Sequence, residues 1–542
     1  MKKISKLVVG WLALTFAATV VWAGSEKLSS DLNGRSSNVE VIVQYKVTPT
    51  EAHHQKVAAL GGKLHSKMDF IKGAHYTVPA SALQTLANDP DVAYITPDRA
   101  IQPSFDQITD GTVYSNVVNS SGYNGAGVGV AIIDSGIADL PDFHNGSTDR
   151  IVYQQSFIGG TPADQYGHGT HVAGILGGNG NGTVYIGIAP QVNIINLRVL
   201  DVNGNGTDSN VIAAIQTAIS LQSQYNIRVI NLSLGRPVYE AAALDPLDQA
   251  VEAAWNAGIT VVVAAGNQGR NNTANTEGYG TIGAPGNDPY VITVGCVKAE
   301  ATTVRTDDLI ASYSSKGPTL YDHYVKPDLI APGNLVVSTL PAGMTLSNLY
   351  PANRVTGNYF TLSGTSMATP VVAAAAAMAY QADPYITPDQ VKAILMATSS
   401  KNNFPTSSVA VDPVTHLSYT SYYDIFTIGA GELNLEAASQ LSSLPSGSAK
   451  SPSVTYNSST GKVTLQGVSG SNVVWGSNVV WGSNVVWGSS VLLANNVVWG
   501  SNVVWGTSSM TGFNVVWGSN VVWGTTSTEA SESMGVAVDG EQ

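Results

Sequence analysis

From about residue 125 onward, short apolar runs alternate with longer segments of helical periodicity. Runs such as GVGVAIID, IRVINLSLG and GITVVVAAGN carry apolar side chains at odd and even positions alike, as expected for strands buried on both faces. Between several of them lie helical patterns such as SNVIAAIQTAISLQ and PLDQAVEAAWNAG. This alternation predicts an α/β fold with a mostly parallel sheet and helices on both faces, over residues 105–440.

A smaller unit precedes this domain. Residues 38–104 begin with the strand pattern VEVIVQYKV and continue with a polar helix, a second strand and a second helix. The segment closes on VAYITPDRAI, which has the pattern of a final strand. We therefore expect a small α+β domain, followed by a loop-like stretch at residues 102–123.

The N-terminus has the layout of a secretory signal peptide over residues 1–23. Three lysines within the first six residues precede an apolar run from Leu7 to Trp22, and small residues follow at 23–25. An uncleaved membrane anchor is the alternative, but about 16 apolar residues are short for a span of about 20. No other stretch is apolar enough, so we expect a secreted protein without a membrane span after signal removal.

The C-terminal region changes composition twice. Residues 441–470 are rich in serine and glycine and predict a linker. Residues 471–524 form nine consecutive six-residue units, seven of which carry NVVW. An acidic tail follows at 525–542. A period of six places every Trp on one face of an extended chain and suits a β-type repeat such as a β-helix. A low-complexity, aggregation-prone tail is the alternative.

Charge and cysteine content narrow the classes of partner. A net charge of −13 argues against nucleic acid and anionic membranes as partners. The single cysteine, Cys296, excludes an intramolecular disulfide, and its setting VITVGCV predicts a buried strand position. The chain must therefore be held together by its core or by bound ions.

Four short glycine-rich motifs offer the parts that acyl transfer to a serine needs: a hydroxyl, a base, an orienting carboxylate and donors for the oxyanion. An apolar strand ends on Asp134 in VAIIDSG, and a helix begins near His168 in YGHGTHVAGILGG. Ser366 opens an alanine-rich helix in LSGTSMATPVV, and Asn267 follows a buried strand in VVVAAGNQG. Each residue alone has an ordinary explanation as a turn or helix-cap residue.

His168 and His171 also form an H-x-x-H pair, which is a possible metal motif. No glutamate stands at the spacing that zinc proteases use, so a metal site is the weaker interpretation.

Together, the four motifs resemble the subtilisin family of serine proteases, over about residues 123–438 and in the family order Asp, His, Asn, Ser. The related sedolisins carry Glu and Asp where this chain has His168 and Asn267. The resemblance implies that Ser366 is the nucleophile and His168 the general base. It also implies that Asp134 orients the imidazole, and that Asn267 and the Ser366 backbone amide bind the oxyanion.

The same resemblance implies a substrate cleft between two chain edges. The edges are expected at Gly204 and Gly206, and at Ser233, Leu234 and Gly235. The primary pocket would be lined by Ala264, Ala265 and Gly266, with Gly283 at its base. Because nothing charged lines this pocket, we expect bulky apolar or aromatic residues before the scissile bond, and Asp208 suggests a basic residue further upstream.

A structural Ca²⁺ is the cofactor that the resemblance implies. Oxygen ligands of the kind that Ca²⁺ prefers would come from Asp142 and from the loop GNGNGTVYIG, with Asn181 as a side-chain ligand and Asn179, Thr183 and Tyr185 as carbonyl ligands. Removal of calcium should then lower thermal stability.

The resemblance further implies that residues 38–101 form an inhibitory pro-region, released by a cut within 99–106. We expect a monomeric, secreted endopeptidase that acts on protein or peptide substrates, with the pro-region as its intramolecular inhibitor. Two alternatives stay open: a surface-display protein in which the Trp repeats carry the function, and a maturation protease with few substrates. The long interval between Asn267 and Ser366 also predicts an insertion within 300–360 that reshapes the cleft.

Overall fold

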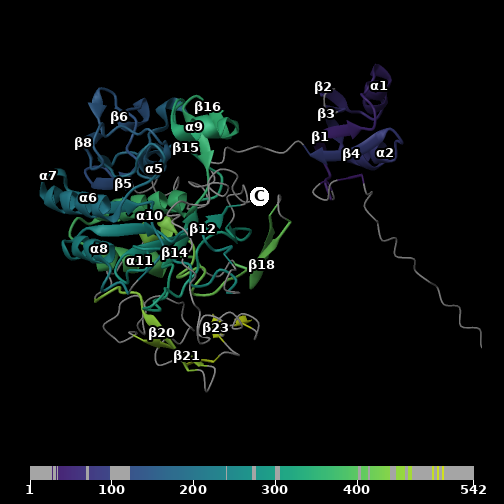
Figure 1. Ribbon diagram of the computed structural model, residues 1–542. Helices are drawn as coiled ribbons and strands as arrows, with labels where there is room; N and C mark the ends of the chain where they lie inside the picture. Colours follow the sequence, from purple (N-terminus) through teal and green to yellow (C-terminus); the bar gives the residue numbers. More distant parts are fainter. Residues whose placement is uncertain are drawn as a thin grey trace, which may run out of the picture. The chain divides into compact units, whose positions relative to one another are not determined.

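The computed structural model divides the chain into two compact units, residues 1–101 and 102–542 (Figure 1). It describes residues 27–28, 32, 34–68, 72–97, 122–239, 241–271, 276–299, 305–400, 404–412, 416–439, 447–457, 462–466, 491–493, 497–499 and 503–505. The predicted signal peptide, the processing region at 99–106, most of the repeats and the acidic tail lie outside these residues. Each unit is considered separately.

The first unit is a four-stranded antiparallel sheet with helices. The sheet has the order β2–β3–β1–β4, with register pairs such as Val41 with Tyr76 and Val43 with Ile95. The elements are β1 (Asn38–Tyr45), α1 (Glu51–Ala59), β2 (Lys63–Met68), β3 (Gly73–Pro79), η3 (Ala80–Ala82), α2 (Leu83–Ala87) and β4 (Val92–Pro97).

One detail of the predicted order of this unit is wrong. The sequence predicted a single strand between the two helices, whereas the structure has the antiparallel pair β2 and β3. Lys72 adopts a positive φ of 54° just before β3, so the chain reverses inside the predicted strand. The alternate residues Ala74, Tyr76 and Val78 of β3 are fully buried in the core of the unit.

The second unit is built on the predicted sheet. Its strands follow the order β13–β12–β11–β10–β5–β9–β8, and β14 also pairs with β12. All these pairings are parallel except that of β12 with β13. The strands are β5 (Gly129–Asp134), β8 (Ile151–Ser156), β9 (Asn193–Arg198), β10 (Ile227–Leu232), β11 (Thr260–Ala264), β12 (Ile292–Lys298), β13 (Leu309–Ile310) and β14 (Leu329–Pro332).

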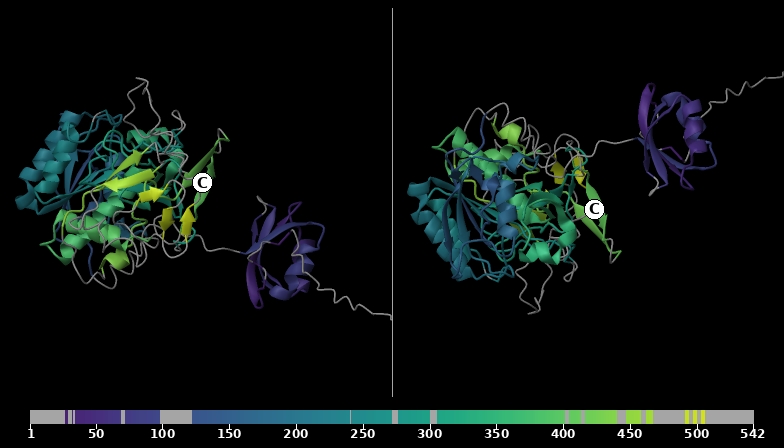
Figure 2. Two further views of the ribbon diagram at one scale, coloured as in Figure 1. Left: turned by 90° about the horizontal axis from the view of Figure 1, so that it is seen from below. Right: turned by 90° about the horizontal axis from the view of Figure 1, so that it is seen from above.

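Helices cover both faces of this sheet, as predicted (Figure 2). Val130 and Ile132 of β5 join one core cluster, and Ala131 and Ile133 join the other, so alternate side chains of the strand serve opposite faces. The first cluster includes α5 (His168–Gly177), α10 (Thr365–Ala382), α11 (Pro388–Thr398) and Leu435 of α12 (Leu435–Ser439). The second includes α6 (Asp208–Ser220), α8 (Pro246–Asn256) and Tyr225 of α7 (Gln222–Tyr225).

Residues 340–358 form a segment that is named the insertion below, because the sequence predicted one in this interval. It connects two strands of a small antiparallel sheet of order β15–β17–β16. The small elements of the unit are η4 (Pro141–Phe143), β6 (His144–Asn145), β7 (Thr148–Asp149), η5 (Gly180–Gly182), β15 (Val336–Thr339), α9 (Thr345–Leu349), η6 (Pro351–Asn353), β16 (Arg354–Thr356), β17 (Tyr359–Leu362), β18 (Ser407–Val411) and β19 (Ser418–Tyr422).

Part of the predicted linker packs onto the second unit instead. Residues 447–457 and 462–466 include the hairpin of β20 (Ser453–Asn457) and β21 (Lys462–Gln466), and Ala449, Val454 and Leu465 join its core. The Ser451 hydroxyl donates to buried Asp328 at 2.6 Å and accepts from buried Lys392 at 3.0 Å. The high serine content concealed two short alternating strands, so the prediction of a linker is wrong for these residues.

The described part of the repeat region contains β22 (Val491–Leu493), β23 (Val497–Trp499) and β24 (Val503–Trp505). β23 and β24 come from consecutive NVVW copies and pair antiparallel, with Trp499 opposite Val503. A β-helix would stack its strands in parallel, so these two copies do not follow that prediction. In the stretches described, no helix reaches the length and apolarity needed to cross a membrane.

Candidate active site

Asp134 and His168 form a buried hydrogen-bonded pair. Asp134 is the last residue of β5 and His168 the first of α5, after Gly167 at a φ of 111°. His168 Nδ1 donates to Asp134 Oδ1 at 2.8 Å, and the Ser135 amide donates to the same oxygen at 2.7 Å. Because an ionised carboxylate can only accept, this pair holds the imidazole proton on Nδ1 and leaves Nε2 as the basic nitrogen.

Asp164, which the sequence did not single out, fixes the loop before His168. Its carboxylate accepts from the amides of Tyr166, Gly167 and Thr170 and from the hydroxyls of Ser135 and Thr170, at 2.6–3.0 Å. Burial raises the pKa of Asp164, and these hydrogen bonds oppose the rise. An aspartate shortly before a helix start is a capping signal that could have identified it.

Ser366 is the second residue of α10, after Gly364 at a φ of 147°. Its hydroxyl donates to the Ser233 carbonyl at 3.0 Å, and the Ser233 hydroxyl donates to the Ser366 carbonyl at 2.8 Å. Pro370 has no backbone N–H, so it cannot donate to the Ser366 carbonyl four residues earlier. This carbonyl instead accepts from the Ser233 hydroxyl. The proline therefore helps to fix a predicted substrate edge beside the candidate nucleophile.

Asn267 presents a buried amide donor next to the same helix start. Its Oδ1 accepts from the amide and the hydroxyl of Thr365 at 3.0 and 3.1 Å, which fixes the orientation of the amide group. Its Nδ2 is buried and has no acceptor in the part of the chain that the structure describes. Since a buried donor without an acceptor costs about 1–3 kcal/mol, this position is suited to an oxygen supplied by a ligand.

Parallel strands bring these residues to one edge of the sheet. β5, β10 and β11 are neighbours about 4.8 Å apart, and Asp134, Ser233 and Asn267 stand at or just beyond their carboxyl ends. His168 is hydrogen-bonded to Asp134, and Ser366 is hydrogen-bonded to Ser233. Thr365 is hydrogen-bonded to Asn267. This is the edge where ligands bind in open α/β sheets.

Several of the predicted cleft residues are held by close contacts. Gly204 has a φ of 80°, and a Cβ there would lie 2.7 Å from the Tyr166 ring; one at Gly206 would lie 2.7 Å from Leu200. Gly283 donates its amide to the Ala265 carbonyl at 3.1 Å, which joins the predicted pocket base to its wall. Ala264 and Gly266 continue that wall, and Leu234 and Gly235 continue the edge from Ser233.

The insertion contacts the loop before His168 and the segment that precedes Gly204. The amides of Thr345 and Leu346 donate to the carbonyls of Gln165 and Tyr166 at 3.1 and 3.0 Å. The Thr345 hydroxyl donates to the Val202 carbonyl at 2.8 Å. Helix α9 therefore connects the loop before His168 with the glycine edge.

The structure argues against the expectation that Asp208 selects a basic residue. Arg236 Nε lies 2.9 Å from both oxygens of Asp208, and its Nη2 lies 2.7 Å from buried Asp245. The charge of Asp208 is thus already paired within the protein, which reduces its attraction for a substrate cation.

His171 has a structural position. It is fully buried on α5, and its Nε2 donates to the Phe360 carbonyl at 2.9 Å. Burial lowers the pKa of His171 to about 3, so it is neutral near neutral pH. The H-x-x-H pair therefore places one histidine in the candidate triad and the other in the core.

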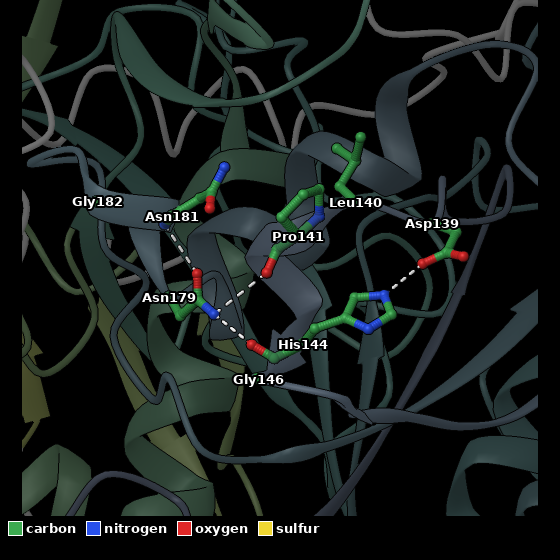
Figure 3. Close-up of a pocket in the computed structure, with 8 residues that line it drawn as sticks. All are labelled: Asp139, Leu140, Pro141, His144, Gly146, Asn179, Asn181 and Gly182. Carbon is green, nitrogen blue, oxygen red and sulfur yellow. Dashed lines mark hydrogen bonds and ion pairs between the residues drawn. The ribbon is translucent and has the colours of Figure 1, made fainter.

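The two side chains predicted to bind Ca²⁺, those of Asp142 and Asn181, do not line a common site. Asp142 is buried, and Oδ1 of its carboxylate accepts from the Tyr359 hydroxyl at 2.5 Å. The Asn179 side chain donates to the carbonyls of Pro141 and His144. Asn179 and Asn181 line an open pocket of about 750 Å³ whose walls do not include Asp142 (Figure 3). Thr183 donates to the Gly180 carbonyl, and the Tyr185 ring packs on Tyr359.

One edge of the sheet thus carries a buried Asp–His pair, a serine at a helix start and a buried amide donor. This arrangement is the one expected of an α/β serine peptidase. Residues 125–412 match the subtilase family. Serine protease AprX of Bacillus subtilis (strain 168) is 36% identical over 355 residues, covering 62% of this chain and 76% of that protein. Subtilisin E of the same strain is 32% identical over 439 residues, covering 79% and 98%.

The extracellular serine proteinase of Thermus sp. (strain Rt41A) is 36% identical over 343 residues, covering 61% of this chain and 72% of that protein. A cold adapted subtilisin-like serine proteinase of known crystal structure shares 31% identity over 52% of this chain and 85% of that chain, with a TM-score of 0.39. The chain belongs to the subtilase family and is a serine-type endopeptidase.

Proposed function

We propose that the chain is a secreted endopeptidase, made as a self-inhibited precursor, in which Ser366, His168 and Asp134 form the triad. Ser366 Oγ bonds to the substrate carbonyl carbon while His168 Nε2 takes its proton. The same proton then passes to the leaving amine as the peptide C–N bond breaks. Water hydrolyses the acyl-enzyme by the same steps, and Asp134 stabilises the imidazolium throughout.

One observation carries this proposal: Asn267 Nδ2 is a buried donor without an acceptor, held next to the start of α10. The amides and dipole at the N-terminus of an 18-residue helix favour negative charge at the same place. The carbonyl oxygen that becomes an oxyanion during attack on Ser366 would satisfy this donor.

Asn267→Asp is expected to lower kcat by about 10²–10³, with little change in KM, a magnitude that comes from subtilisin rather than from this chain. The aspartate keeps an oxygen for Thr365 but replaces the donor with an acceptor. Steady-state hydrolysis of a chromogenic peptide measures the effect.

Asn353→Asp is the matched control, since Asn353 Nδ2 donates to the Thr361 carbonyl in the insertion. A kcat loss of equal size in both variants, or a loss confined to KM for Asn267→Asp, would argue against an oxyanion role.

The pocket formed by Ala264, Ala265, Gly266 and Gly283 is proposed to select apolar or aromatic side chains before the scissile bond. A charged side chain there would lose its hydration without a partner. In a peptide library, Phe, Tyr, Leu and Met are expected to exceed Lys and Glu at this position by about 10-fold or more in kcat/KM. A preference for either charged class would reject this assignment.

Residues 38–101 are proposed to inhibit the enzyme until they are removed. Support comes from the separate core of this unit, which packs Val41, Val43, Tyr76 and Ile95 without the second unit. Support for export comes from the N-terminal leader pattern and from the extracellular relative in Thermus. Mass spectrometry of the product in the culture medium tests both points, because it defines both processed ends.

A further inference from the structure

Tyr359 occupies the junction between Asp142 and the loop of residues 179–185. It is the first residue of β17 and is buried. Its hydroxyl lies 2.5 Å from Asp142 Oδ1 and 2.9 Å from the Gly180 carbonyl oxygen. Two acceptors from separate segments therefore meet at one hydroxyl.

The loop closes around this tyrosine. The ring of Tyr185 lies against the ring of Tyr359, with centroids 4.8 Å apart, and Val337 of β15 belongs to the same apolar cluster. The Asn179 amide donates to the Asp142 carbonyl at 2.9 Å, so the backbone of the loop is tied to η4 as well. Ring, hydroxyl and backbone contacts together fix the loop.

We propose that the Tyr359 hydroxyl takes the place of a bound cation between Asp142 and the 179–185 loop, so that this junction is stable without metal. A cation bridges oxygens by accepting their lone pairs; here one hydroxyl proton serves the carboxylate or the carbonyl. The tyrosine reaches this position through the sheet β15–β17–β16, which ties the junction to the insertion. This inference does not depend on the catalytic roles of Ser366 or His168.

The electrostatics of the junction agree with this arrangement. Burial raises the pKa of Asp142, and the Tyr359 hydrogen bond and Arg150 oppose the rise. Arg150 Nη2 donates to the Asp142 backbone carbonyl at 2.6 Å, so a positive charge already stands near this residue. A second cation there would be repelled by this guanidinium.

The test uses the full chain carrying Ser366→Ala, which prevents self-digestion. Thermal unfolding is followed in excess EDTA and in millimolar CaCl₂. We expect the midpoint to differ by less than about 1 °C between the two, and Tyr359→Phe to lower it by about 2–4 °C. Tyr153→Phe, which removes a hydroxyl bonded to Gln155 elsewhere, is the matched control and should have the smaller effect.

Asp142→Asn separates a hydroxyl-bridged junction from a cation-bridged one. An amide oxygen still accepts from Tyr359, but it lacks the negative charge and the second oxygen with which a carboxylate holds Ca²⁺. The proposal would be overturned if EDTA lowers the midpoint of thermal unfolding, CaCl₂ restores it, and Asp142→Asn no longer shows this effect. Equal midpoints for Tyr359→Phe and the parent would overturn it too. An EDTA effect of the same size in parent and Asp142→Asn comes from another site and leaves this junction metal-independent, as proposed.

Discussion

Ser366→Ala is expected to lower kcat by about 10⁶-fold, the size of the loss measured when the nucleophile of subtilisin is removed. The substitution removes the proposed attacking oxygen together with its hydrogen bond to the Ser233 carbonyl. Alanine is a good helix former, so α10 and the fold should persist. If the precursor cleaves itself, the variant should also keep residues 38–101 attached, which mass spectrometry of the purified chain would show.

Ser399→Ala is a suitable control for this experiment. Ser399 is also buried, and its hydroxyl donates to the Leu395 carbonyl at the end of α11, away from the sheet edge. It should retain activity and processing. Peptide hydrolysis by Ser366→Ala at a rate near that of the parent would reject the nucleophile assignment, and normal processing of Ser366→Ala alone would reject only self-cleavage.

Asp134→Asn is expected to lower kcat by about 10⁴-fold, as for orienting aspartates of other triads. An asparagine that turns its NH₂ group toward His168 Nδ1 forces the imidazole proton onto Nε2. That nitrogen then cannot accept the proton of Ser366. Steady-state kinetics measure the loss, and the thermal midpoint shows whether the buried site still folds.

Asp139→Asn provides the comparison, because Asp139 is five residues away and pairs with His144 near the protein surface. It should change kcat by less than about twofold, as surface substitutions rarely matter. A loss of less than tenfold for Asp134→Asn would show that Asp134 does not control the histidine tautomer.

Much of the larger unit could be predicted from local sequence. Strands buried on two faces require apolar residues at every position, so runs such as VAIID and TVVVAA are unambiguous. The positions of Asp134 and Asn267 after apolar strands also place both residues at the carboxyl edge of a parallel sheet, where active residues gather. The resemblance to the subtilisin family then indicated His168, rather than His171, as the candidate triad histidine.

Predictions failed where local composition and tertiary contact disagree. Residues 447–457 look like a linker, yet Ala449 and Val454 are buried in the core of the second unit, and the Ala449 amide donates to Asp389 of α11, 60 residues earlier. Asp208 looks like an exposed charge until Arg236 is placed beside it. Neither partner can be inferred from the spacing along the chain.

The sequence by itself determined the fold class and the identity of the candidate triad, because burial periodicity and glycine-rich motifs are local properties. The tertiary structure alone decided what each polar group faces. Thr365 fixes the orientation of the Asn267 side chain, whose Nδ2 has no acceptor among the described residues. Tyr359 lies against Asp142, where the sequence predicted Ca²⁺. These contacts join residues about 100 to 220 positions apart, and such pairings depend on how the sheet and its insertion pack rather than on any local pattern.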